Sequence, residues 1–75
     1  MGVVFDYSEL KGRIVARFGN FAKYAEAVRL SRSQVSDRLN NKVRFKHEDI
    51  IASCASDVLD IPAEEIGKYF FTPKV

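Results

Sequence analysis

The segment NFAKYAEAVRLSRSQVSDRLNNK, residues 20–42, constrains the fold of this chain more than any other stretch. It predicts two short helices joined by a tight turn. Small or apolar residues recur where each helix would face a core (Ala25, Val28, Val35 and Leu39). Ser31 and Gln34 form an S-x-x-Q capping box, and Leu30 can pack on Val35 as a hydrophobic staple. We therefore expect the second helix of this pair to begin directly after Ser31.

Start and stop signals predict three further helices. Before the central pair, Asp6 is the expected cap of a helix that Gly19 ends, with one apolar side (Leu10, Ile14, Val15 and Phe18). After it, residues 47–59 predict a helix with a broad apolar face (Ile50, Ile51, Cys54, Ala55, Val58 and Leu59). Pro62 suits the first turn of a last helix. The sequence thus predicts an all-α protein of five helices, with residues 1–75 as one domain.

Composition narrows the class of protein. A chain of 75 residues with 47% hydrophobic residues indicates a single folded domain and excludes a disordered segment. The single cysteine forms no internal disulfide framework, which is typical of the reducing cytosol. No apolar run approaches the roughly 20 residues of a membrane span. We expect a soluble cytoplasmic protein without a membrane partner.

The sequence offers no convincing catalytic or metal site. His47 is the only histidine, whereas a zinc site needs three or four ligands. Cys54 lies on the expected apolar face of its helix, where it is expected to act as a small core residue. Glu64 and Glu65 are adjacent and diverge around a helix, and the four glycines form no phosphate-binding loop. We expect no enzymatic activity, cofactor or bound metal.

Charge is unevenly distributed, although the net charge is only +2. Residues 29–46 contain six basic residues and one acid, whereas residues 47–67 contain six acids and no Lys or Arg. One face can therefore attract phosphate while the other repels it. This pattern favours a nucleic-acid partner held in one orientation. The alternative is a solvated charged surface that binds nothing.

The second helix of the central pair, residues 32–40, is the predicted reading surface. At about 100° per residue, Val35 and Leu39 define its buried side. The opposite arc presents side chains that can hydrogen bond to base edges in a DNA major groove (Arg32, Ser33, Ser36, Asp37 and Asn40). Asp37 either accepts from a base or orients a neighbouring arginine. The other predicted DNA contacts, mainly to phosphates, are Asn20, Arg38, Asn41, Lys42 and Arg44.

The central segment resembles the helix-turn-helix of the phage lambda-repressor/Cro family. The ends FDYSELKGRI and IPAEEIGKYFFTPKV resemble those of a small phage Cro-like group, so the resemblance covers nearly the whole chain. It implies a lambda-repressor-like domain, encoded by a phage or prophage, that binds operator DNA in a bacterial cell, commonly as a dimer. By position, Arg32, Ser33, Ser36 and Asp37 match its base-facing residues, and residues 40–42 match its phosphate-contacting end.

Two positions depart from that family. Phe21 stands where the family often has Gln, and a phenyl ring cannot make the hydrogen bonds that support base-reading side chains. Arg29 stands where the turn usually has Gly. Either Arg29 adopts a positive φ, at a cost of about 1 kcal/mol, or the turn has a different shape. These two departures affect the expected contacts with DNA more than the expected fold.

Two functions fit these observations. The first is a sequence-specific DNA-binding transcriptional regulator that reads double-stranded DNA with residues 32–40, as a homodimer. The second is an antirepressor that keeps the fold but binds a partner repressor, using an acidic face of residues 47–59 and the aromatic tail. That tail contains three consecutive aromatic residues, of which one or two are expected to be exposed (Tyr69, Phe70 and Phe71). Alternatively, the tail folds back and seals the domain.

Overall fold

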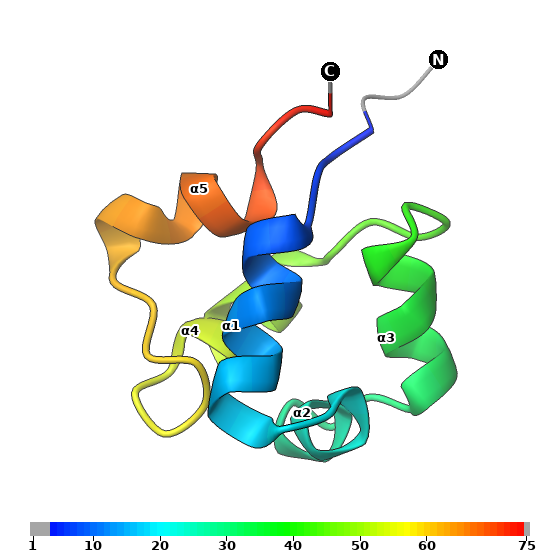
Figure 1. Cartoon of the computed structure of the whole chain (residues 1–75), viewed down its shortest axis with the longest axis vertical. Coiled ribbons are helices and arrows are strands. Elements are labelled where there is room, and N and C mark those ends of the chain that lie inside the picture. Colours follow the sequence, from blue (N-terminus) through cyan, green and yellow to red (C-terminus); the bar gives the residue numbers. More distant parts are fainter. Residues whose placement is uncertain (1–3, 75) are drawn as a thin grey trace.

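The computed structural model describes residues 4–74 and contains five α-helices. They are α1 (Ser8–Phe18), α2 (Phe21–Ala27), α3 (Arg32–Leu39), α4 (His47–Cys54) and α5 (Ile66–Phe70), with a short 3₁₀ helix η1 (Ala63–Glu65) before α5. In Figure 1, α3 stands at one edge of the molecule and α5 at the opposite edge. Within residues 4–74 no strand forms, so the predicted all-α fold with five helices is confirmed.

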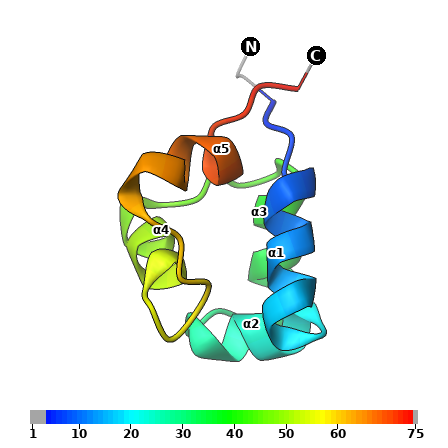
Figure 2. The same ribbon diagram turned by 60° about the vertical axis from the view of Figure 1, so that its left-hand side comes forward.

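One hydrophobic core lies between the helices. Figure 2 shows α1 and α4 on opposite sides, with α2 at one end and α5 at the other. The largest fully buried side chains come from several of these elements and from the loop after α4 (Leu10, Ile14, Tyr24, Val35, Leu59 and Phe70). Full burial of one such apolar side chain stabilises the fold by roughly 1.5–3 kcal/mol. The predicted core positions of the central helix pair are all buried, as expected (Ala25, Val28, Val35 and Leu39).

The turn between α2 and α3 is a Schellman motif. The backbone N–H of Arg29 donates to the carbonyl of Glu26 at 3.2 Å, and that of Leu30 donates to the carbonyl of Ala25 at 2.9 Å. Arg29 has a φ of +60°. Of the two alternatives that the sequence left open, Arg29 therefore adopts the left-handed conformation and the turn keeps its tight shape.

Replacing Arg29 with glycine is expected to stabilise the protein. The left-handed conformation costs a non-glycine residue about 1–2 kcal/mol, whereas the greater freedom of glycine in the unfolded chain costs about 0.5–1 kcal/mol. The free energy of unfolding, measured by urea denaturation, should rise by roughly 0.5–1 kcal/mol. Arg29→Ala is the matched control, because it removes the same side chain and keeps the strain. Equal stability of the two variants would contradict this account of the turn.

The start of α3 agrees with the sequence prediction. The hydroxyl of Ser31 accepts from the N–H of Gln34 at 3.1 Å, and the side chain of Gln34 accepts from the N–H of Ser31 at 2.8 Å. The capping box is therefore complete. It fixes where α3 begins, and hence which of its residues face outward.

α1 begins slightly later than predicted. Tyr7 occupies the N-cap position, and the Asp6 carboxylate instead accepts from the N–H and the hydroxyl of Ser8, at 2.9 and 2.6 Å. These two hydrogen bonds lower the pKa of Asp6. Gly19 ends the helix as predicted, with a φ of +84°. Val15 was predicted to face the core, but it is 48% exposed.

α4 is shorter than predicted, because it ends at Cys54 and the chain continues as a loop. Arg13 and Arg17 of α1 hold this loop by donating to four of its carbonyl groups, those of Ser56, Val58, Leu59 and Asp60, at 2.9–3.3 Å. The two arginines thus satisfy carbonyls that a continued helix would have paired. Ile51, which was predicted to lie on the apolar face, is 57% exposed.

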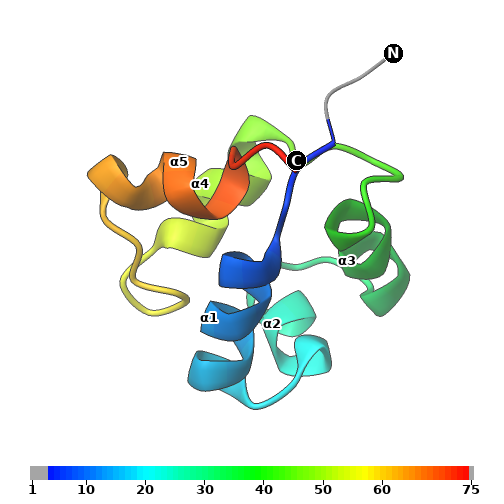
Figure 3. The same cartoon turned by 45° about the horizontal axis from the view of Figure 1, so that its top comes forward.

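The two ends of the described chain pair with each other. Phe5 and Pro73 form an antiparallel bridge. Backbone hydrogen bonds of 2.8 Å flank it, from Asp6 to Thr72 and from Lys74 to Val4. Figure 3 shows this pair of segments beside the loop that follows α3. The bridge thus brings the C-terminal tail next to the predicted functional helix.

Candidate interaction surface

The outward side of α3 carries most of the residues that were predicted to contact bases. Asp37 is half-buried. The other four are exposed (Arg32, Ser33, Ser36 and Asn40). Val35 and Leu39 hold the opposite side of the helix in the core. The Asn40 side chain donates to the carbonyl and the hydroxyl of Ser36, at 2.9 and 3.2 Å. The structure therefore brings the residues that were predicted to face bases together on one side of one helix.

Arg38 does not belong to this surface, although it was predicted to contact DNA, because its side chain is buried. It is 5% exposed, and its Nε donates to Oδ2 of Asp49 in α4 at 2.9 Å. Its Nη1 donates to the carbonyl of Gln34 at 3.1 Å. Arg38 follows the buried Val35 by three positions, and this spacing was the sequence signal that it lies on the inner side of the helix.

Asn41 and Asn20 use their side chains within the protein. The Asn41 amide accepts from the N–H of Phe5 and donates to its carbonyl, each at 2.9 Å. Asn41 has a φ of +62° and occupies the left-handed position of a second Schellman motif, after α3. Asn20 caps α2 by accepting from the N–H of Lys23 at 3.0 Å. A phosphate contact by either amide would compete with these hydrogen bonds.

Among the predicted phosphate contacts, Lys42 and Arg44 are the exposed cations. Both line a recess of about 330 Å³, which we call the terminal recess, formed by Val4, Phe5, Tyr7, Lys42, Val43 and Arg44 beside Asn41. The Arg44 guanidinium lies 5.7 Å from the centroid of the Phe5 ring. Sequence reasoning missed this recess, because it joins residues that are far apart in the chain.

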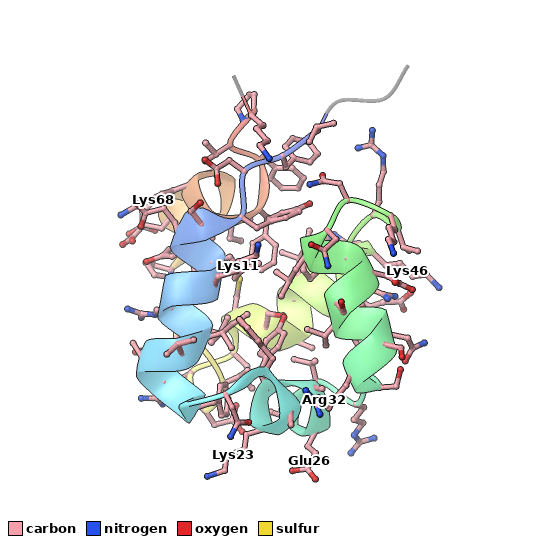
Figure 4. The ribbon with its side chains drawn as sticks, turned by 45° about the vertical axis from the view of Figure 1, so that its right-hand side comes forward. Lys11, Lys23, Glu26, Arg32, Lys46 and Lys68 are labelled. Carbon is pink, nitrogen blue, oxygen red and sulfur yellow. The ribbon has the colours of Figure 1, made fainter. Side chains whose placement is uncertain are left out.

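The first turn of α2 adjoins the interhelical turn and carries an apolar side chain. Phe21 opens the helix and is 37% exposed. Figure 4 shows Lys23 and Glu26 of α2 projecting at the end of the molecule where Arg32 begins α3. This end of the surface therefore combines an aromatic ring with charges of both signs.

The charge asymmetry of the sequence persists in the fold. Exposed basic residues surround α3 and the loop after it (Arg29, Arg32, Lys42, Arg44 and Lys46). The loop after α4 and the 3₁₀ helix η1 carry exposed acids (Asp57, Asp60 and Glu64). Figure 1 shows this segment of the chain at the edge of the molecule opposite α3. The electrostatic field around the α3 surface is therefore positive relative to the rest of the protein.

The histidine, the cysteine and the aromatic tail of the chain lie as follows. His47 is exposed, and Cys54 is half-buried against the core, where burial raises the pKa of its thiol. Tyr69 and Phe70 are buried, and Phe71 is 50% exposed, so one of the three tail aromatics faces solvent. Within residues 4–74 no group of three acidic, His or Cys side chains is placed to hold a metal ion. No helix of this part of the chain has the length and apolarity that crossing a membrane requires.

Comparison with known proteins identifies a protein family and a similar solved structure. Residues 3–73 match the model of a family described as "Protein of unknown function (DUF739)". The fold is similar to the solution structure of the modulator of repression (MOR) of the temperate bacteriophage TP901-1 from Lactococcus lactis, with a TM-score of 0.75. The two sequences are 39% identical, and the match covers 89% of this chain and 88% of the other. No curated protein matches this chain.

The similarity to a phage protein supports the predicted association with phages and with the regulation of repression. Membership of the Cro-like group stays a prediction from the sequence. Because the family model spans almost every residue, the chain belongs to the DUF739 family.

Proposed function

We propose that this protein is a regulator of phage repression that acts by binding a repressor protein. The observation that carries the proposal is its likeness, over nearly the whole of both chains, to a modulator of repression. At 39% identity the likeness extends beyond the backbone to many side chains. This is the second of the two functions that the sequence allowed, the antirepressor.

The chemistry of α3 supports a protein partner. Binding to the DNA backbone depends on several Lys, Arg and polar groups that reach phosphates. Arg38 is buried in an ion pair, so Arg32 is the one exposed cation within α3. The amide of Asn41 is engaged with the backbone of Phe5. Fewer of the predicted contacts are therefore available to DNA than the sequence suggested.

The exposed end of α2 supports the same conclusion. Phe21 offers apolar contact area, and aromatic residues are enriched in the cores of protein interfaces. Glu26 projects at the end of the molecule where α3 begins (Figure 4), and a carboxylate there would repel a phosphate. A partner with its own apolar and charged side chains fits this mixture better than a uniformly anionic backbone.

A charge-adding substitution distinguishes protein from DNA as the partner. Ser36→Arg places a bulky cation in the middle of the outward side of α3. We expect it to weaken the complex with the phage repressor by about tenfold or more, because a tightly packed interface excludes it. The same change should strengthen any contact with DNA, because it adds a cation near phosphate. Isothermal titration calorimetry with the repressor and a gel-shift assay with operator DNA measure the two effects.

Ala63→Arg is the matched control, since Ala63 is exposed on η1, away from α3. It adds the same side chain and should leave repressor affinity unchanged. Absence of a complex between the wild-type protein and the repressor would contradict the proposal. A loss of affinity that is equal in the two variants would place the interface elsewhere.

Direct binding to operator DNA, as a dimer, is the second candidate. The exposure of Arg32 and Ser33 on α3, with Lys42 and Arg44 beside its end, favours it. In that case Arg32→Ala should relax the preference at one base position, and Lys42→Ala should weaken binding to all sequences alike. Binding titrations at two salt concentrations measure both effects. If neither substitution changes the affinity for DNA, this candidate fails.

A further inference from the structure

Exposed apolar side chains gather around the terminal recess. Val4 and Val43 line it and are 48% and 43% exposed. Phe71 is 50% exposed and packs edge-on against Phe5, with 5.8 Å between the ring centroids. Three of the six large apolar side chains that are exposed in residues 4–74 thus line the recess or pack against one of its lining residues. Such a cluster on a small soluble protein is typical of an interaction site.

The charged residues that line the terminal recess are both cations. Lys42 and Arg44 contribute to its wall, and none of its described lining residues is Asp or Glu. Burial raises the pKa of the Tyr7 phenol, and the positive charge of Arg44 opposes that rise. The nearby Asp6 is hydrogen bonded to Ser8 instead. An anionic group that enters the recess would therefore meet two cations.

The terminal recess is held in shape before any partner binds. Asn41 makes two hydrogen bonds to the backbone of Phe5, which also bridges to Pro73. The ring of Tyr7 packs against that of Phe45, with 5.3 Å between the centroids. A preformed site loses little conformational entropy on binding. Because the backbone of Phe5 is already paired, recognition would rely on side chains and not on an added strand.

We propose that the terminal recess binds an acidic and apolar segment of the partner repressor, in which a carboxylate stands next to a large apolar side chain. The carboxylate pairs with Lys42 or Arg44, and the apolar side chain packs among Val4, Phe5 and Val43. A volume of about 330 Å³ suits one or two side chains. A DNA phosphate would satisfy the cations but would leave the apolar lining in water. This inference rests on the proposed function. It specifies which kinds of repressor side chain bind in the recess beside α3.

The test is the affinity for the repressor of the same phage, measured by isothermal titration calorimetry. Lys42→Glu should weaken the complex by about tenfold or more, because it places a second carboxylate next to the carboxylate of the repressor. Val43→Ala keeps every charge and should weaken it by about three- to tenfold, while leaving any affinity for DNA unchanged. Lys46→Glu is the control, because Lys46 is an exposed cation of the same loop that does not line the recess. Thermal melts confirm that each variant is folded.

The outcomes separate the two proposals. Suppose that the wild-type protein binds the repressor, and that the Lys42→Glu variant binds it as tightly as the Lys46→Glu variant does. The recess is then not the docking site, while the proposed function stands. If Val43→Ala binds the repressor as tightly as the wild-type protein does, the apolar part of the inference is wrong. If the variants lose affinity for DNA alone, the occupant is a phosphate backbone and the inference is overturned. If the wild-type protein binds no repressor, both proposals fail.

Discussion

Asp49→Ala is expected to lower the free energy of unfolding by about 3–5 kcal/mol, because it leaves the guanidinium of Arg38 buried without a counter-charge. The side chains of this pair are only 6% and 11% exposed, and 2.9 Å separates Nε of Arg38 from Oδ2 of Asp49. Asp49 Oδ2 also accepts from the N–H of Lys46 at 3.0 Å, so the substitution removes a cap of α4 as well. A domain of this size has a total stability of roughly 4–11 kcal/mol. The substitution should therefore remove a large part of the stability of the domain.

Two further variants show whether the ion pair is responsible. Glu48→Ala removes an exposed acid from the same turn of α4 and should change stability by less than about 0.5 kcal/mol. Arg38→Met combined with Asp49→Leu should recover part of the loss, because an apolar pair needs no counter-charge. Urea denaturation followed by circular dichroism measures all three variants. If Asp49→Ala is as stable as Glu48→Ala, the pair does not hold α3 against α4.

Raising the pH from about 10 to 12 should cost the protein up to about 2.7 kcal/mol through Tyr24 alone. Burial raises the pKa of the Tyr24 phenol from 10.0 to about 12. Below pH 10.0 the phenol is protonated in both the folded and the unfolded states, so its contribution is complete. Above that pH the unfolded chain ionises first, and stability falls as the pH rises through the folded-state pKa.

Tyr24→Phe isolates this effect from the ionisation of other groups. The Ser53 hydroxyl donates to the carbonyl of Asp49 at 2.7 Å, so the Tyr24 hydroxyl donates to Ser53, at 2.6 Å. Losing that hydrogen bond should cost about 0.5–1.5 kcal/mol at every pH. The variant should lose less stability than the wild-type protein between about pH 9 and 12. Urea denaturation curves at several pH values give the comparison, and identical slopes for the two proteins would refute the assignment.

The sequence predicted those parts of the fold that depend on neighbouring residues. Ser31 and Gln34 are three positions apart, and their capping box forms as expected. Gly19 ends α1, and the spacing of Val35 and Leu39 orients α3. Each of these features rests on hydrogen bonds or periodicity within one or two helical turns. Local chemistry therefore sufficed for the number of helices and for the inner side of the central pair.

Features that depend on distant residues were not predictable from local patterns. Arg38 meets Asp49 across two helices, and Asn41 meets Phe5 over 36 positions of the chain. The early end of α4 depends on Arg13, which reaches the carbonyl of Leu59 from α1. The residues next to these polar side chains in the sequence do not distinguish them from polar side chains that face solvent. Their roles follow only from the tertiary fold.

The nature of the partner was also beyond local patterns. An amphipathic helix with an outward side of Arg32, Ser33 and Ser36 is compatible with either bases or a protein surface. Phe21 was the sequence signal against base reading, because a phenyl ring cannot make the hydrogen bonds that support base-reading side chains. The burial of Arg38 adds the second argument, because it removes a cation from the face that DNA would need.

Amide chemical-shift mapping of the isotope-labelled protein, titrated with the phage repressor, tests the central claim most directly. The account predicts shifts concentrated at Arg32, Ser33 and Ser36, extending to residues 42–44 at the terminal recess. Titration with operator DNA alone should leave the same amides unshifted at about 0.15 M salt, where weak phosphate contacts are screened. Shifts on these residues with DNA, and none with the repressor, would contradict the account.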